Sequence, residues 1–213
     1  MKGRARSGTV AVSAAAPSVT ASAGAGKAAS VTEPATVDRQ AVVSAAVAKV
    51  EVPSGARVSV AVPAPESGES AVYGDAAFDT ASIVKVDVLA ALLLQAQDAG
   101  RRLTARERAY AAKMIENSDN ASATALWHTI GRAAGLDAAN ERFGLTRTSG
   151  GDGEPWGLTQ TTAADQLVLL QQVFGADSKL GAASRTYLEG LMKSVESHQR
   201  WGCRPPPEET PGR

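Results

Sequence analysis

The sequence predicts an α/β domain that is mostly helical and has an incomplete antiparallel sheet. The run from Val84 to Leu94 is apolar on nearly all sides, as expected for a helix in the middle of a domain. Only two segments, at 57–63 and 70–74, have the pattern of strands. After Phe174 no alternating β-branched run follows. Since an isolated two-stranded hairpin is marginally stable in water, the helices must supply most of the core.

The first expected elements are one helix and one hairpin. A helix is predicted over 37–50, because its valines and alanines share a face and Asp38 lies near its start. Residues 57–62 alternate as a strand, with their valines on one face. A turn at 65–68 leads to the returning strand at 70–73.

Helices separated by polar loops are predicted for most of the remaining chain. A glycine-rich loop at 148–157 interrupts them. Serine, threonine or glycine stands at most of the expected helix ends, where these residues cap well. The expected helices run from Ser82 to Gly100, Thr104 to Ile115, Ser118 to Gly131, Gly135 to Gly144, Thr161 or Thr162 to Phe174, and Ser184 to Ser197.

Three regions of different composition divide the chain. Residues 1–36 contain mainly small side chains, and we expect either a disordered leader or a weak secretory signal with a basic start. Residues 37–200 form the predicted folded domain. Residues 201–213 are proline-rich and are expected to be a disordered tail.

The composition argues against several classes of function. Lysine plus arginine equals aspartate plus glutamate, at 22 each, which gives no electrostatic case for a nucleic acid or an anionic membrane as partner. No apolar run approaches the roughly 18 residues that span a bilayer. A single cysteine, Cys203, and two histidines exclude a disulfide framework and argue against a zinc site. We therefore predict no metal and no cofactor.

Ser82 and Lys85 form the first motif that could carry out catalytic chemistry. A helix that starts at the serine places residue i+3 one turn along the same face, so the amine can reach the hydroxyl. Burial at the base of an apolar helix would lower the pKa of Lys85, as a base requires. A Ser-x-x-Lys pattern is common, however, and Ser82 could instead be a helix cap with Lys85 directed to solvent.

Ser118-Asp119-Asn120 is the second motif, at the start of another predicted helix. These residue types are preferred helix caps, which is the purely structural explanation. The functional interpretation makes Ser118 a proton relay toward a leaving nitrogen, with the Asn120 amide binding a substrate carbonyl. Two such motifs in this order are more specific than either alone.

Together the two motifs resemble the paired signatures of class A β-lactamases and penicillin-binding proteins. Neighbouring segments are also similar to that family, including Phe78–Ser82 and Thr161–Asp165, and the likeness covers about residues 37–200. It implies a β-lactamase/transpeptidase-like fold whose helical half is largely present.

The resemblance also implies roles for these residues. Ser82 would be the acylated nucleophile and Lys85 its base. Ser118 would relay the proton, and Asn120 would position the substrate and Lys85. The Ser82 backbone N–H would form half of an oxyanion hole. No Gly-x-Ser-x-Gly elbow is present, which disfavours a Ser-His-Asp hydrolase.

The implied substrate is a small-molecule β-lactam or the acyl-D-Ala-D-Ala-like amide of a peptidoglycan stem peptide. Such enzymes act at the cell envelope, so we expect a secreted or envelope protein, a monomer, with no cofactor. Two alternatives remain: a non-catalytic remnant or binding module, and a peptidoglycan D,D-peptidase.

The chain departs from the family pattern in two places. The third signature, Lys-Thr/Ser-Gly, is absent: Leu180 follows Lys179, and Lys193 is followed by Ser194 and Val195. Glu154 is the candidate for the family's water-activating glutamate, but the residues after it do not match the family's Glu-x-x-Leu-Asn. A solvated loop carboxylate is the alternative for it. We expect a C-terminally truncated member of the family, with impaired activity.

Overall fold

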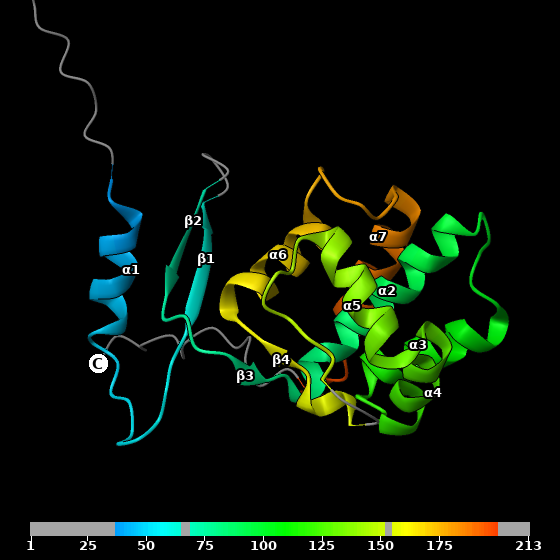
Figure 1. The fold of residues 1–213 in the computed structure, drawn as a ribbon, viewed down its shortest axis with the longest axis horizontal. Coiled ribbons are helices and arrows are strands. Elements are labelled where there is room, and N and C mark those ends of the chain that lie inside the picture. Colours follow the sequence, from blue (N-terminus) through cyan, green and yellow to red (C-terminus); the bar gives the residue numbers. More distant parts are fainter. Residues whose placement is uncertain (1–36, 65–68, 152–154, 200–213) are drawn as a thin grey trace, which may run out of the picture. The chain divides into compact units, whose positions relative to one another are not determined.

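The structure, a computed structural model, describes residues 37–64, 69–151 and 155–199. The expected leader and tail therefore lie outside the described residues, as does the 65–68 turn. The helices and strands are shown in Figure 1. In chain order they are α1 Arg39–Val47, β1 Val60–Ala64, β2 Glu69–Tyr73, β3 Phe78–Asp79, η1 Ala81–Ile83, α2 Val84–Asp98, α3 Ala105–Glu116, α4 Asn120–Ile130, α5 Arg132–Phe143, η2 Trp156–Leu158, β4 Gln160–Thr161, α6 Ala163–Phe174, α7 Ala182–Lys193 and η3 Ser197–Gln199.

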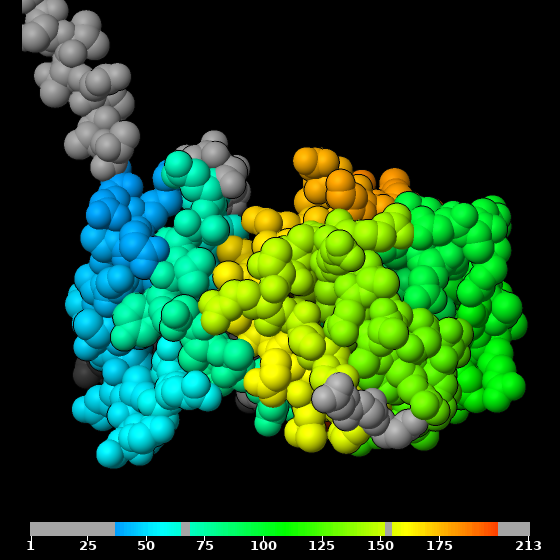
Figure 2. All heavy atoms as spheres, viewed as in Figure 1, coloured from blue at the N-terminus to red at the C-terminus, as the bar shows by residue number. Residues whose placement is uncertain are grey.

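Helix α2 is the centre of the helical core, as the sequence predicts. Eleven of its 15 residues are buried, so it is covered on all sides. Helices α3, α4, α5 and α7 pack against it. Leu89, Leu92 and Leu94 are almost completely buried, and each contributes about 1.5–3 kcal/mol of hydrophobic stabilisation. In Figure 2 the helical part, coloured green to orange, is closely packed.

Helix ends follow local capping chemistry. Thr104 accepts a hydrogen bond from the Glu107 N–H, and the Glu107 carboxylate accepts one from the Thr104 N–H, which closes a capping box at the start of α3. Gly131 has φ +93° and ends α4 while starting α5. Helix α5 therefore begins at Arg132, and the expectation that it starts at Gly135 is wrong.

Strands β1 and β2 form the expected antiparallel hairpin, but β1 begins later than predicted. Pairing starts with Val60 opposite Tyr73 and ends with Ala64 opposite Glu69. Gly74, at φ +73°, turns the chain directly after β2, so residues before Val60 have no strand partner in the hairpin. Strand β1 therefore starts at Val60 and not at residue 57.

Helix α1 packs against β2 and is shorter than the predicted 37–50. Asp38 caps it by accepting a hydrogen bond from the Ala41 N–H. The Gln40 side chain pairs with both backbone polar groups of Val72, so it satisfies the outer edge of β2 as a neighbouring strand would. The expected apolar face is only partly covered, since Val42 is 56% exposed.

A second small antiparallel pair joins distant parts of the chain. Strand β3 pairs with β4, Phe78 opposite Thr161, and Ser149 bridges to Gln160. Alternation cannot reveal strands of two residues, so the sequence did not predict this pair. It connects the 148–157 loop to the segment that precedes Ser82.

The last helices differ little from expectation. Thr162 caps α6 by accepting a hydrogen bond from the Asp165 N–H. Helix α7 ends at Lys193, earlier than the predicted Ser197, because Ser194 caps it with both its N–H and its hydroxyl directed at the Gly190 carbonyl. The architecture is α/β with short antiparallel sheets and a dominant helical part, which confirms the predicted fold class.

Candidate functional site

Ser82 lies in the turn that joins β3 to α2. It is the middle residue of the 3₁₀ turn η1 and is exposed. Ala81, directly before it, has φ +45°, a conformation that residues with a Cβ rarely adopt. Such backbone strain persists only where the surrounding structure imposes it, and it is frequent at functional sites. Here Thr80 holds the turn, because its N–H donates to the Thr159 carbonyl at 2.9 Å.

Lys85 lies in the first turn of α2 and is 2% exposed. Its amine lies 3.1 Å from the Ser82 hydroxyl, as the i, i+3 spacing predicts. It also lies 2.8 Å from Asn120 Oδ1, and 2.9 Å and 2.7 Å from the hydroxyl and carbonyl oxygens of Ser118. Lys85 is therefore not directed to solvent, and the capping-only explanation of the first motif is wrong.

Ser118 reaches this place from the connection between α3 and α4, and Asn120 from the first position of α4. Ser118 has φ +56°, and its hydroxyl donates to the Ser82 hydroxyl at 3.2 Å. Asp119, between them, turns away and caps α4 by accepting a hydrogen bond from the Ser122 N–H at 2.7 Å. The structure thus brings Ser82, Lys85, Ser118 and Asn120 together, and we call this group the Ser82 site.

Burial and a neighbouring charge act on the pKa of the Lys85 amine in opposite directions. Burial lowers the pKa of Lys85 below its usual value, and the Asp119 carboxylate acts in the opposite direction. Hydrogen bonds to Ser122 in turn lower the pKa of Asp119, which keeps that carboxylate ionised. A buried amine beside hydroxyl groups has the properties of a general base.

Trp156 is a site neighbour that the sequence analysis did not assign. Its ring centre lies 5.0 Å from the Lys85 amine, and its indole N–H donates to the Thr124 hydroxyl at 3.1 Å. One signal could have identified it. The chain has only three tryptophans, and one of them stands in an otherwise polar, glycine-rich loop.

The carboxylate of Asp165 anchors the loop that carries Trp156. It accepts hydrogen bonds from the Thr148 hydroxyl and the Arg147 N–H, at 2.7 and 2.8 Å. The hydroxyl of Thr161, in β4, forms a hydrogen bond with the Thr148 hydroxyl at 2.8 Å. This buried cluster fixes both ends of the loop beside the Ser82 site.

The remaining predictions concern residues elsewhere. Glu154 lies outside the described residues. His128 lies on the exposed side of α4. Within the described ranges, no group of three or more His, Cys, Asp or Glu side chains could hold a metal ion. None of the helices described there has the length and apolar character that a membrane crossing needs.

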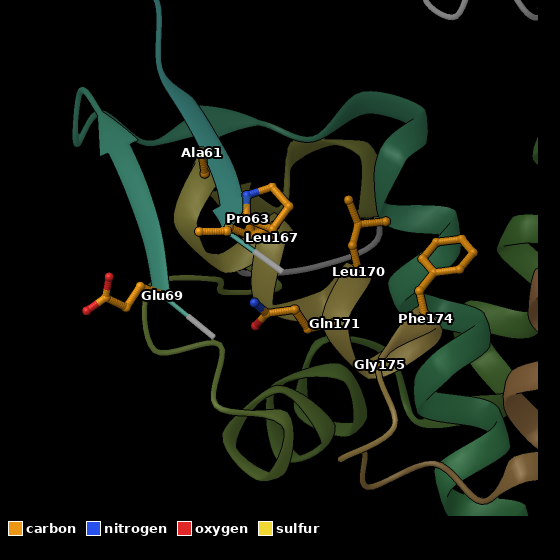
Figure 3. A pocket seen from close by; sticks show the side chains of 9 residues that line it. Ala61, Pro63, Glu69, Leu167, Leu170, Gln171, Phe174 and Gly175 are labelled. Atoms are coloured by element: carbon orange, nitrogen blue, oxygen red, sulfur yellow. The ribbon is translucent and has the colours of Figure 1, made fainter. Parts of the chain in front are cut away.

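A separate apolar groove lies between β1, β2 and α6 (Figure 3). Leu170 and Phe174 from α6 line it and are 39% and 52% exposed. Glu69 and Gln171 supply polar groups at its margin. No member of the Ser82 site lines this groove, so the two features are distinct.

Comparison with solved structures places this arrangement in a known fold. A β-lactamase from Xanthomonas campestris pv. campestris is similar with a TM-score of 0.59 and 22% identity, over 67% of this chain and 65% of that one. An ancestral class A β-lactamase (GNCA) has a TM-score of 0.57 and 26% identity, over 69% of each chain. The chain has the serine β-lactamase fold.

The serine β-lactamase fold confirms the resemblance inferred from the two motifs. L2, solved in complex with relebactam, is another similar structure, with a TM-score of 0.56 and 22% identity over 65% of this chain and 63% of that one. The present chain thus spans about two thirds of the length of these structures. No family model and no curated protein matches the sequence.

Proposed function

We propose that this protein is a serine hydrolase of the β-lactamase type that is acylated at Ser82. The observation that carries the proposal is the position of the Lys85 amine, which contacts both serine hydroxyls and the Asn120 amide oxygen at 2.8–3.1 Å. A nucleophilic hydroxyl, a buried base and a second hydroxyl for proton relay are the groups that acyl transfer needs.

The hydrogen-bond geometry suits a neutral Lys85 amine. The Ser118 carbonyl and the Asn120 amide oxygen can only accept, and a neutral amine has two N–H groups for them. Its lone pair is then free to accept the Ser82 hydroxyl proton at 3.1 Å. Ser118 in turn donates to Ser82. In this state the amine is ready to take a proton, and once protonated it has a third N–H for the Ser118 hydroxyl, 2.9 Å away.

The proposed reaction has three proton transfers. Ser82 Oγ forms a bond to the amide carbonyl carbon while its proton passes to the Lys85 amine. The C–N bond then breaks, and the Ser118 hydroxyl gives its proton to the leaving nitrogen. Lys85 returns a proton to Ser118 across their 2.9 Å contact. The product of this half-reaction is an ester on Ser82; the amine leaves when the substrate is a peptide and stays attached to the acyl group when it is a β-lactam.

The proposed substrate is a strained or activated amide in a small molecule, either a β-lactam or an acyl-D-Ala-D-Ala-like peptide. The complex of the structural neighbour L2 with relebactam supports small-molecule binding. We propose that Asn120 binds the substrate carbonyl and that the Ser82 N–H stabilises the oxyanion. These substrates also favour a secreted or cell-envelope location.

A non-catalytic protein is the second candidate, because the sequence lacks the Lys-Thr/Ser-Gly signature. That signature would supply the second oxyanion donor and a substrate-binding cation. Loss of one oxyanion donor typically slows acyl transfer by about 100- to 1000-fold. Glu154 remains the candidate for activating a deacylating water. Without an effective base there, the ester on Ser82 would persist.

Intact-mass measurement tests the proposal. The purified chain is incubated with a β-lactam and, in parallel, with an acyl-D-Ala-D-Ala peptide. We expect a covalent adduct that is lost in Ser82→Ala. An adduct with the peptide alone would favour the D,D-peptidase. No adduct with either compound, with both compounds unchanged and a chain that circular dichroism shows to be folded, would contradict the proposal and leave the non-catalytic candidate.

A further inference from the structure

Trp156 packs against the side of Lys85 that faces η2. The ring centre lies 5.0 Å from the amine, while the oxygens that contact the amine come from Ser82, Ser118 and Asn120. The indole is partly buried and packs against the hydrophobic core. It therefore gives the amine an apolar neighbour, since the ring carbons form no conventional hydrogen bond with the amine.

Two sets of contacts hold the indole in this place. Its N–H donates to the Thr124 hydroxyl on α4, at 3.1 Å. The residues after Trp156 are bonded to the turn before Ser82. The Thr80 hydroxyl donates to the Gly157 carbonyl in η2, and the Thr80 N–H donates to the Thr159 carbonyl just after η2. The ring is thus fixed from α4 and from the segment before Ser82.

Exposure to solvent differs sharply within the Ser82 site. Ser82 and Asn120 are exposed, yet Lys85, which contacts both, is 2% exposed. Side chains of the Ser82 site are hydrophilic and can be hydrated. An indole over the amine excludes water from the side that it covers, and its Thr124 bond prevents it from swinging away.

We propose that Trp156 is a positioning residue for Lys85: its indole, anchored by Thr124, shields the amine from water and keeps it in the neutral, proton-accepting state. This inference rests on the proposed role of Lys85 as the base for Ser82. It assigns a function in the site to a residue far from both sequence motifs.

The ring acts on the protonation of Lys85 in two opposing ways. The face of an indole attracts an ammonium and so favours the charged form of Lys85. Removal from water disfavours that form. The pKa of Lys85 is lowered, with burial as the main cause, against the attraction of Asp119. The proposal requires the removal from water to be the larger of the two effects of the ring, so loss of the ring should raise the pKa of Lys85.

The test is a pH titration of Lys85 in the full chain, followed by NMR on protein labelled with ¹³C at lysine Cε. Trp156→Ala should raise the pKa of Lys85 by about one unit, since it opens the amine to water. Trp156→Phe retains an aromatic cover and should restore most of the wild-type value. Leu158→Ala, in the same turn but 57% exposed, is the matched control and should change nothing.

A second variant guards against misfolding of Trp156→Ala. Thr124→Val removes only the indole anchor, and we expect a shift in the same direction but smaller. An unchanged or lowered pKa of Lys85 in folded Trp156→Ala, or in Thr124→Val should the former not fold, overturns the inference.

Acylation rates separate this inference from the proposed function. If a β-lactam reacts with the wild type, the pH profile of acylation should move to higher pH in Trp156→Ala in parallel with the NMR titration. If no variant reacts, the proposed function fails. The NMR titration still decides whether Trp156 controls the protonation of Lys85, because it needs no substrate.

Discussion

The Lys85 amine lies 3.1 Å from the Ser82 hydroxyl, within hydrogen-bond distance and one helical turn along the chain. The amine is buried and the hydroxyl is exposed. A base that is shielded from water beside a nucleophile that a substrate can reach is an arrangement suited to acyl transfer. Retaining this lysine must also reduce stability, because burial removes a polar amine from water.

Replacement of Lys85 should therefore separate activity from stability. In Lys85→Met the base is lost, and we expect acylation of Ser82 to slow by about 100- to 10,000-fold. The methionine fills similar space without a charge, so the melting temperature should stay equal or rise. Acylation kinetics and thermal denaturation measure the two effects. A large loss of stability with normal acylation would contradict the assigned role of Lys85.

The acylation rate should depend on pH through the same amine. Only neutral Lys85 can accept the Ser82 proton, and burial lowers the pKa of this amine. The rate should rise with pH and level off below the ordinary lysine value of 10.5. Arginine stays protonated, so acylation of the Lys85→Arg variant should be slow and should not become faster as pH rises. A wild-type profile that is flat with pH would argue against Lys85 as base.

Asp87, also on α2, should make the protein less stable as pH rises. Burial raises the pKa of this carboxyl to about 7, and Asp137 and Asp165 act in the same direction. The Asn140 side chain acts in the opposite direction as a hydrogen-bonding neighbour, but burial dominates. Between about pH 4 and pH 7 the unfolded chain is ionised at this residue while the folded chain keeps the proton. The free energy of unfolding should thus fall across that interval by up to ~4 kcal/mol.

Urea denaturation of the wild type and Asp87→Asn at several pH values measures this contribution. The neutral amide cannot ionise, so the decline should be smaller in Asp87→Asn. Asp98→Asn, on the same helix, is the matched control, because Asp98 is exposed and paired with Arg142. If the wild type and Asp87→Asn give parallel curves, Asp87 is not a buried acid.

Much of the helical part follows from the sequence because helix signals are local. Periodicity and caps place α2, α3, α4 and α6 within a few residues of their observed bounds. The contacts of Ser82 with Lys85 follow from helix geometry. Ser118 and Asn120 could be placed beside them only through the family resemblance, since they come from another element.

Contacts that depend on the path of a loop could not be predicted. Trp156 and Lys85 are joined only after the chain passes through three more helices and a glycine-rich loop. The start of α5 at Arg132 depends on Gly131 serving two helices at once. The burial of Asp87 is a tertiary result, and we have no physical account of why an acid occupies that position.

Loss of the Asp165 hydrogen bonds should lower both the stability and the activity of the protein. Asp165→Ala removes the acceptor for the Thr148 hydroxyl and the Arg147 N–H, so two hydrogen bonds to a buried carboxylate are lost. We expect a loss of about 2 kcal/mol in the free energy of unfolding. Released from this anchor, the loop should hold Trp156 less firmly and acylation should slow. Unaltered stability in urea denaturation would show that this cluster is not an anchor.

Peptide mapping of the β-lactam adduct tests the central claim most directly. The full chain is incubated with the β-lactam, digested, and each peptide is weighed. Activation of Ser82 by Lys85 predicts one added β-lactam mass on the peptide that contains Ser82, and none there in Lys85→Met on the same timescale. An unmodified Ser82 peptide, with any adduct located on another nucleophile such as a surface amine, would contradict the claim.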